Sequence, residues 1–205
     1  MKLKKRDDTI VNLKSEIREL QYQSDCSLQY SMRPNLKITG IKYEKEENLK
    51  DKVIDLCKDI GVTIKEEDIS VTHRVGTRED PSDTSDNNQK IPTIIAKFVR
   101  RETRNKVFDA RKALHSHSTR TSVYISDHVT PLRSRMMYEL RNRGNKTAFK
   151  YVWSREGRIY ARKPEEVNQR NPADQPKPHI INRPEDLKKL GWTDEEILNI
   201  IENKR

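Results

Sequence analysis

The stretch TIIAKFVRRETRNKVFDARKAL, residues 93–114, joins a strand pattern to a helix pattern and decides the fold. Its first eight residues are rich in branched apolar side chains, which is typical of a strand. The residues after them place Val107, Ala110 and Leu114 at the three- and four-residue spacing of one helix face. A strand followed at once by an amphipathic helix indicates a domain in which helices cover a sheet.

Similar patterns extend outward on both sides of this stretch. Alternating apolar residues predict strands at 35–41, 68–76 and 123–129, and a helix is expected between Asn48, which suits an N-cap, and Gly61, which suits a stop. The resulting order βαββαβ is that of the split βαβ ferredoxin-like sandwich. In that fold two helices cover one face of an antiparallel sheet and leave the other face open.

A second, smaller unit is predicted after residue 129. Thr130, Pro131 and Gly144 bracket a helix, and a hairpin with SREG at its turn follows at 149–163. We therefore predict an α+β chain in five segments. They are a coiled-coil helix at 1–32, an RRM-like domain at 33–129, a small basic domain at 130–163, a linker at 164–178 and a tail with short helices at 179–205.

The first residues carry a heptad pattern. Leu3, Ile10 and Ile17 recur every seven residues, and Leu13 and Leu20 follow the last two by three. This spacing predicts a coiled-coil seam through which the chain associates with itself, and isoleucine followed by leucine favours two strands. A plain amphipathic helix docked on the body is the alternative, because fewer than three heptads make a marginal coil.

Positive charge is concentrated in one third of the chain. Residues 97–163 carry 18 Lys and Arg against 5 Asp and Glu, whereas the remaining residues are slightly acidic, although the whole chain has a net charge of +10. Such clustering is the electrostatic footprint of a protein that binds nucleic acid; a solvated or membrane-surface face is the alternative. No apolar run is long enough for a membrane span or a signal peptide, so we expect a location in the cytoplasm or the nucleus.

The hairpin AFKYVWSREGRIYARK, residues 148–163, interleaves aromatic and basic side chains. Single-stranded nucleic acid offers both phosphates and unstacked bases, so a binder needs cations together with flat rings. We predict that Tyr151, Trp153 and Tyr160 stack on bases. We predict that the phosphates are bound by Lys150, Arg155, Arg158 and Arg162. Phe149, Tyr151 and Trp153 share one strand face, and a position in the core of the small domain is the alternative for these rings.

Other arginines are candidates for phosphate contacts on the same nucleic-acid-binding surface. They are Arg74, Arg100, Arg101, Arg104, Arg133, Arg135, Arg141 and Arg143. A solvated face with local ion pairs is the alternative for most of them, and a salt bridge at the end of a sheet is the alternative for Arg74.

Enzymatic chemistry is not expected. Cys26 and Cys57 lack the CxxC spacing of zinc or redox sites, and no P-loop, GxSxG string or paired carboxylates occur in a catalytic setting. We predict no catalytic residue, no metal and no cofactor.

Several strings in this order resemble a known family. They are EEDISVTHRVG, IPTIIAKFVRRETRNKVFDARKAL, VYISDHVTPLRSRMMYELRN and KYVWSREGRIYARK. Together they resemble the RNA-binding proteins encoded by the first open reading frame of LINE-type, non-LTR retrotransposons. The C-terminal part, including HIINRPEDLKKLGW, is similar to the baculovirus few-polyhedra (FP) protein.

The resemblance implies a trimeric coiled coil, an RRM-like domain and a small C-terminal domain. Together these bind single-stranded RNA with little sequence preference and act as a nucleic-acid chaperone that packages a ribonucleoprotein. The RNP1 string of an RRM is absent, so bases are not expected to stack on the sheet of residues 35–128. Whether the coil is a dimer or a trimer stays open, as does the choice between RNA and DNA. The alternative function is an oligomeric structural or adaptor protein of the FP type that acts mainly through protein contacts.

Overall fold

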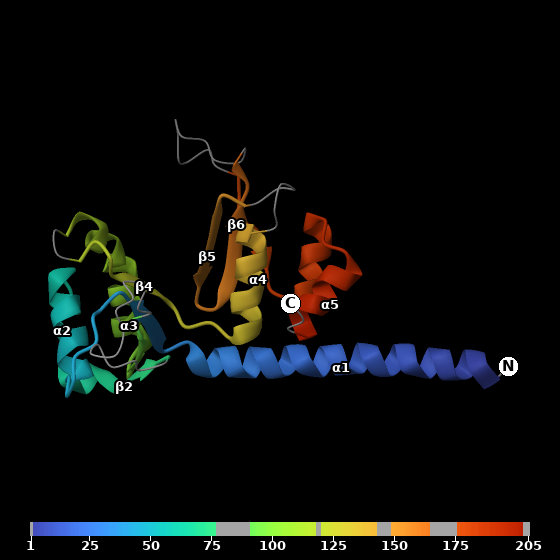
Figure 1. The fold of residues 1–205 in the computed structure, drawn as a ribbon, viewed down its shortest axis with the longest axis horizontal. Helices are drawn as coiled ribbons and strands as arrows, with labels where there is room; N and C mark the ends of the chain where they lie inside the picture. Colours follow the sequence, from blue (N-terminus) through green and yellow to red (C-terminus); the bar gives the residue numbers. More distant parts are fainter. Residues whose placement is uncertain (1, 77–90, 118–119, 143–148, 165–175, 203–205) are drawn as a thin grey trace, which may run out of the picture. The chain divides into compact units, whose positions relative to one another are not determined.

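The computed structural model describes residues 2–76, 91–117, 120–142, 149–164 and 176–202, with side chains from residue 6 onward. They form two compact units. The central unit is Arg33–His128, and the terminal unit combines Met1–Met32 with Val129–Arg205. Helices and antiparallel strands occur in both units (Figure 1), so the predicted α+β class is confirmed.

The central unit is built around one antiparallel sheet. Its main elements are β1 (Asn35–Thr39), α2 (Leu49–Asp59), β2 (Ile69–Val75), β3 (Thr93–Phe98), α3 (Arg101–Ala110) and β4 (Tyr124–Asp127). Two short 3-10 helices, η1 (Glu66–Asp68) and η2 (Arg111–Ser116), precede β2 and follow α3. The strands lie in the order β2-β3-β1-β4, so β1 and β3 are the central pair.

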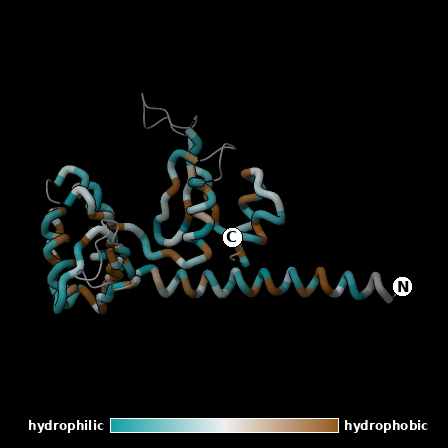
Figure 2. The backbone as a smooth tube through the Cα atoms, in the orientation of Figure 1, coloured by the Kyte–Doolittle hydropathy of each residue, from teal (hydrophilic) through white to brown (hydrophobic). Residues whose placement is uncertain are grey.

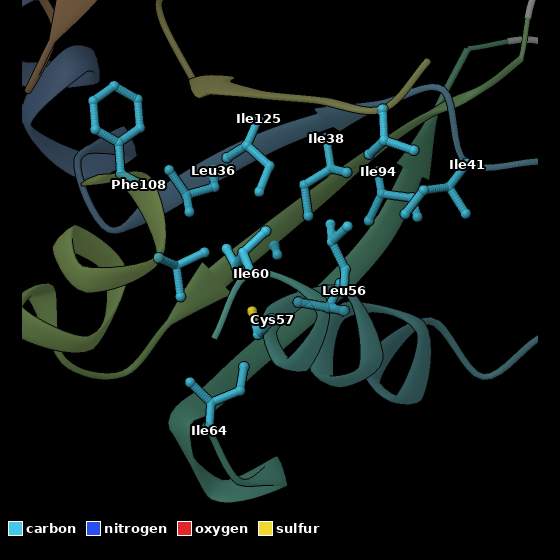
Figure 3. Close-up of a cluster of buried hydrophobic side chains, with 14 of the residues drawn as sticks. Leu36, Ile38, Ile41, Leu56, Cys57, Ile60, Ile64, Ile94, Phe108 and Ile125 are labelled. Carbon is cyan, nitrogen blue, oxygen red and sulfur yellow. The ribbon is translucent and has the colours of Figure 1, made fainter. Parts of the chain in front are cut away.

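One face of this sheet packs against the helices. Leu36, Ile38 and Ile94 alternate along β1 and β3 and are buried in the same cluster as Leu56 of α2 and Phe108 of α3 (Figure 3). Burial of branched apolar side chains at every second strand position is the pattern from which the strands were predicted. The predicted N-cap is also confirmed, because the Asn48 side chain accepts the amide of Lys50 at the start of α2.

The opposite face of the central sheet carries exposed polar and apolar side chains around Ile95, which is buried. Lys37 of β1 lies opposite Ile95 of β3 and Ser126 of β4, and His73 of β2 also lies opposite Ile95. Residues that face each other across neighbouring strands point to the same side of the sheet. Tyr124 is the aromatic residue that the described strands contribute to this face.

The terminal unit combines both ends of the chain. It contains α1 (Lys2–Met32), α4 (Pro131–Asn142), β5 (Tyr151–Arg155), β6 (Arg158–Arg162), β7 (His179–Ile181), η5 (Pro184–Leu190) and α5 (Asp194–Glu202). The three strands form an antiparallel sheet in the order β5-β6-β7. Its core gathers Met136, Leu140, Phe149, Ile159, Ile181, Leu187, Trp192 and Ile197.

The tail contributes directly to this sheet and core. Ile181 of β7 lies opposite Ile159 of β6, and Trp192 is buried next to η5. The capping box predicted for the last helix is confirmed, since Thr193 and Glu196 exchange hydrogen bonds. The predicted linker lies mostly outside the described residues, as does the polar loop expected at 77–90.

Helix α1 is a single long helix whose apolar residues recur along its length (Figure 2). Four of the five predicted seam residues are about half exposed: Ile10, Leu13, Ile17 and Leu20. The side chain of the fifth, Leu3, lies outside the described part. Neither α1 nor any other described helix has the length and apolar character needed to cross a membrane.

Candidate nucleic-acid interface

The turn of the β5–β6 hairpin fixes which residues face each other. Glu156 and Gly157 both have positive φ, at 52° and 81°, which is the signature of a two-residue type I′ turn. The predicted positive φ of Gly157 is therefore confirmed. Because the turn has two residues, Arg155 lies directly opposite Arg158, Trp153 opposite Tyr160 and Tyr151 opposite Arg162.

The hairpin has an inner face and an open face. Ser154, Ile159 and Ala161 are buried, and the two apolar residues join the terminal core. The other face carries the three pairs named above, and we call these six residues the open face: Tyr151, Trp153, Arg155, Arg158, Tyr160 and Arg162. Alternation along both strands thus brings three rings and three guanidinium groups onto one surface.

The aromatic rings of the open face lie outside the core. Trp153 and Tyr160 stack on each other with ring centroids 5.6 Å apart and an interplanar angle of 14°. Tyr151 is 45% exposed, and Lys150 Nζ lies 5.4 Å from its ring centroid. The core of this unit contains Trp192 but not Trp153. The alternative that Trp153 occupies a core position is therefore wrong. Phe149 does belong to the core.

The arginines of the open face differ in exposure. Arg155 and Arg158 are exposed and lie side by side at the turn, whereas Arg162 is half-buried opposite Tyr151. Two adjacent guanidinium groups next to a ring pair offer both hydrogen-bond donors and a flat surface.

Arg74 is not on a surface. Its guanidinium is buried, and all five of its N–H groups are engaged with Glu47, Ile41, Lys42 and Pro92. Hydrogen bonding from Arg74 lowers the pKa of the Glu47 carboxyl to about 2. Arg74 therefore stabilises the central unit. Its ion pair with Glu47 agrees with the alternative of a salt bridge, and not with a phosphate contact.

Arg104 is also a buried structural residue. Its guanidinium pairs with the carboxylate of Asp127 in β4, and both side chains are 2% exposed. The same guanidinium lies 4.8 Å from the ring centroid of Phe108. Its helix position places it toward the sheet, where a phosphate does not reach it.

Arg133 occupies the first turn of α4 and is buried. Its Nε donates to Asp25 of α1 at 2.8 Å, and its Nη1 donates to the carbonyl oxygen of Gly157 at 2.6 Å. Arg133 therefore ties α4 to α1 and to the hairpin turn. Arg133 was predicted to contact phosphate, as were Arg74 and Arg104, but the structure places all three guanidinium groups in internal ion pairs.

Two further arginines of α4 brace neighbouring elements. Arg135 donates to the carbonyl oxygens of Ile200 and Ile201 at the last turn of α5, where a cation is favoured by the helix dipole. Arg141 is exposed and donates to the carbonyl oxygen of Val152 in β5 at 2.8 Å. Arg143 lies outside the described residues.

Arg100 and Arg101 are exposed at the start of α3 in the central unit. They belong to a different unit from the hairpin. The structure thus brings together the predicted nucleic-acid-binding residues of the hairpin, and it assigns three of the predicted arginines to internal ion pairs.

The partners of these arginines are not marked in the sequence. Asp25 and Gln29 are four residues apart on α1, which marks one helix face, but two polar residues at that spacing also fit a solvated surface. Nothing local to Arg133 indicates that its carboxylate partner lies 108 residues away.

Metal ligands do not cluster in the described residues: no three His, Cys, Asp or Glu side chains there could hold an ion. Cys57 is buried in the central core, where desolvation raises the pKa of its thiol to about 12. A thiol with that pKa stays protonated at neutral pH and is unreactive.

Comparison with known proteins identifies one matching stretch. A family model described as Baculovirus FP protein domain 2 matches residues 130–191. The match begins at the cap of α4, includes the hairpin and β7, and ends after η5, covering less than a third of the chain. No curated protein matches. The C-terminal part of this chain, over residues 130–191, is therefore similar to the second domain of the baculovirus FP protein, as its sequence predicted.

Proposed function

We propose that this protein binds single-stranded nucleic acid, RNA in the first place, with little sequence preference. The observation that carries the proposal is the open face of the hairpin. Tyr151, the Trp153–Tyr160 pair and two exposed arginines share one surface there. Surfaces that combine cations with aromatic platforms are typical of proteins that bind unpaired strands.

The chemistry of the open face matches the chemistry of an unpaired strand. A base that stacks on an aromatic ring contributes about 1–3 kcal/mol whatever its identity, because every base has a flat face. Arginines that contact phosphates release counterions, which adds a term that weakens with salt. Neither contact reads a base edge, so the expected binding is nonspecific.

The proposed interface is smaller than the predicted one. It consists of the open face with Lys150, and with Arg141 at its border on β5. Arg74, Arg104 and Arg133 are left out because their guanidinium groups are buried in ion pairs. Arg100 and Arg101 are retained as a second, separate patch on the central unit.

We also propose that the central unit is a split βαβ, RRM-like domain. The element order and the strand order β2-β3-β1-β4 support it. On this proposal the two units, with self-association through α1 as a dimer or trimer, make up a chaperone or packaging protein of a retrotransposon-like element. On this proposal the protein is not an enzyme and acts in the cytoplasm or the nucleus.

A second candidate function has support of its own. The match of residues 130–191 to an FP protein domain is compatible with the alternative, an oligomeric structural or adaptor protein of the FP type whose main contacts are with proteins. In that case the open face would bind a protein surface, and stacked rings flanked by arginines also suit such an interface.

Salt titration separates the two candidates. Fluorescence anisotropy of labelled single-stranded RNA, single-stranded DNA and duplex of equal length, each at several salt concentrations, measures the slope of log K against log salt. A nucleic-acid binder should prefer both single strands and give a slope of about −0.7 for each phosphate contacted. Micromolar or weaker binding that does not change with salt would contradict the proposal and favour the adaptor.

A further inference from the structure

A buried polar cluster joins the first helix to the start of α4. It consists of Asp25 and Gln29 on α1 with Thr130, Arg133 and Gly157, and we call it the latch. The Asp25 carboxylate accepts hydrogen bonds from Thr130 Oγ1 at 2.5 Å and from Arg133 Nε at 2.8 Å. The Gln29 side-chain oxygen accepts the backbone N–H of Thr130 at 3.0 Å.

The latch acts as an N-terminal cap for α4 that is supplied by a distant helix. The first backbone N–H groups of a helix lack partners within it, and the N-terminus favours a negative charge. Thr130 Oγ1 accepts the amide of Arg133 as a local cap and in turn donates to Asp25. Asp25 thus sits at the positive end of α4 and neutralises Arg133.

The hairpin turn is part of the same cluster. Arg133 Nη1 donates to the Gly157 carbonyl oxygen, and a Cβ at Gly157 would lie 2.5 Å from Cγ of Gln29. Gly157 therefore has two reasons to lack a side chain, its φ of 81° and its contact with α1. Because the polar atoms of these buried side chains are paired, the network specifies one arrangement of α1, α4 and the turn.

A second contact lies one to two turns earlier on α1. The Arg183 guanidinium, just before η5, lies 3.9 Å from the ring centroid of Tyr22, and its Nη1 is 3.0 Å from Glu19 Oε2. Glu19, Tyr22, Asp25 and Gln29 follow each other at three- and four-residue spacing. They therefore form one docking face of α1.

The docking face and the predicted seam lie on nearly opposite sides of α1. At about 100° per residue, the centre of Ile10, Leu13, Ile17 and Leu20 is roughly 160° around the helix from the centre of the docking face. In the terminal unit, α4 and the hairpin lie on one side of α1 (Figure 1), and the seam residues remain about half exposed.

We propose that α1 is a two-sided connector: its docking face holds the terminal unit of the same chain through the latch, and its seam binds α1 of a second copy. Self-association then leaves every hairpin turn anchored on the outside of the coil. The latch half follows from contacts within the terminal unit, whereas the seam half rests on the self-association in the proposed function.

Two matched double variants of the full chain test the two sides separately. Asp25→Ala/Gln29→Ala removes the latch acceptors, and Leu13→Asn/Leu20→Asn places amides on the seam. Light scattering measures the mass, and hydrogen exchange with residue resolution measures protection of the Thr130 amide, whose acceptor is Gln29 Oε1.

The latch variant should keep the oligomeric mass and lose at least tenfold protection at Thr130. The seam variant should have the mass of a monomer and keep that protection, while residues 6–18 of α1 exchange faster because a single helix is marginal. Full protection of Thr130 in the latch variant, or its loss in the seam variant, would overturn the latch in cis. A monomeric latch variant would overturn the separation of the two faces. An unchanged mass of the seam variant would overturn the seam assignment alone.

Discussion

The two sheets of this protein share an architecture, but the arginines on their strands differ in exposure. Each is antiparallel, and each has one face that buries apolar side chains. In the central unit, Arg74 and Arg104 are buried in ion pairs. In the terminal unit, Arg155 and Arg158 stand exposed on a sheet face that also carries aromatic rings.

The difference shows that arginine content by itself does not define a binding surface. Each unit contributes residues to the stretch where positive charge is concentrated, residues 97–163. A guanidinium on a face that packs inward must find a carboxylate, because an unpaired buried charge is costly. A guanidinium on an outward strand position has no such need and can meet a ligand.

The largest expected effect contrasts Arg104 with Arg158. Arg104→Ala leaves Asp127 buried without its partner and should lower the stability of the central unit by about 3–5 kcal/mol. Arg158→Ala removes an exposed side chain and should change stability by less than about 0.5 kcal/mol. Urea unfolding followed by circular dichroism checks both.

The two tryptophans provide an internal control for this comparison. Both Trp153 and Trp192 belong to the terminal unit. Tryptophan fluorescence should therefore report an unaltered terminal transition in the Arg104 variant. Equal losses of stability for the two arginines would contradict the distinction between the sheets.

Acid should weaken the central unit through Glu47. Arg74 lowers the pKa of Glu47 to about 2 from its ordinary 4.5. A lowered pKa in the folded state stabilises the fold above pH 4.5, and this contribution is lost as the pH falls from about 4.5 to 2. It amounts to at most about 3 kcal/mol.

Hydrogen exchange of the β2 and β3 amides, measured across this pH range after correction for intrinsic rates, checks the prediction. Glu47→Gln should remove that part of the pH dependence. The amides of β5 and β6 serve as the reference, because Glu47 does not belong to their unit. The same acid response in wild type and Glu47→Gln would rule out this pair as its cause.

Removing two positive charges from the exposed face of each sheet tests which of the two faces binds RNA. Arg155→Ala/Arg158→Ala should weaken binding to single-stranded RNA by about 2 kcal/mol, roughly 30-fold, and reduce the salt slope by about 1.4. Lys37→Ala/Lys97→Ala removes the same charge from the central sheet and should cost no more than about twofold. Equal losses from the two variants would indicate a diffuse electrostatic attraction.

The smallest expected effect compares one tyrosine on each sheet. Tyr160→Ala removes a ring that stacks on Trp153 and should weaken RNA binding by about 1–2 kcal/mol, alike for unrelated sequences. Tyr124→Ala, on the central sheet, should leave affinity unchanged. A melting temperature of the Tyr160 variant lower by many degrees would mark this ring as structural instead.

Local features of the fold were predictable because they depend on neighbours in the chain. The cap at Asn48, the capping box of Thr193 and Glu196 and the turn glycine Gly157 each follow from a few adjacent residues. Alternation also predicted that Phe149, Tyr151 and Trp153 share a face. The register confirms this for Tyr151 and Trp153, whereas Phe149 precedes β5 and is buried in the core.

The interaction partner of each arginine was not predictable from the sequence. In α4, Arg133, Arg135 and Arg141 look alike in the sequence, yet one completes the latch, one caps α5 and one braces β5. Helix periodicity gives the direction of a side chain around its axis. It does not say which distant element lies in that direction.

The sequence by itself determined the α+β class, the hairpin with its rings and cations on one face, and the likeness of residues 130–191 to an FP protein domain. Only the tertiary structure decided that Arg74, Arg104 and Arg133 are anchors and that the two ends of the chain form one unit. The physical reason is that a strand or turn is stabilised by residues close in sequence, whereas a buried charge is stabilised by a partner that folding brings from far along the chain.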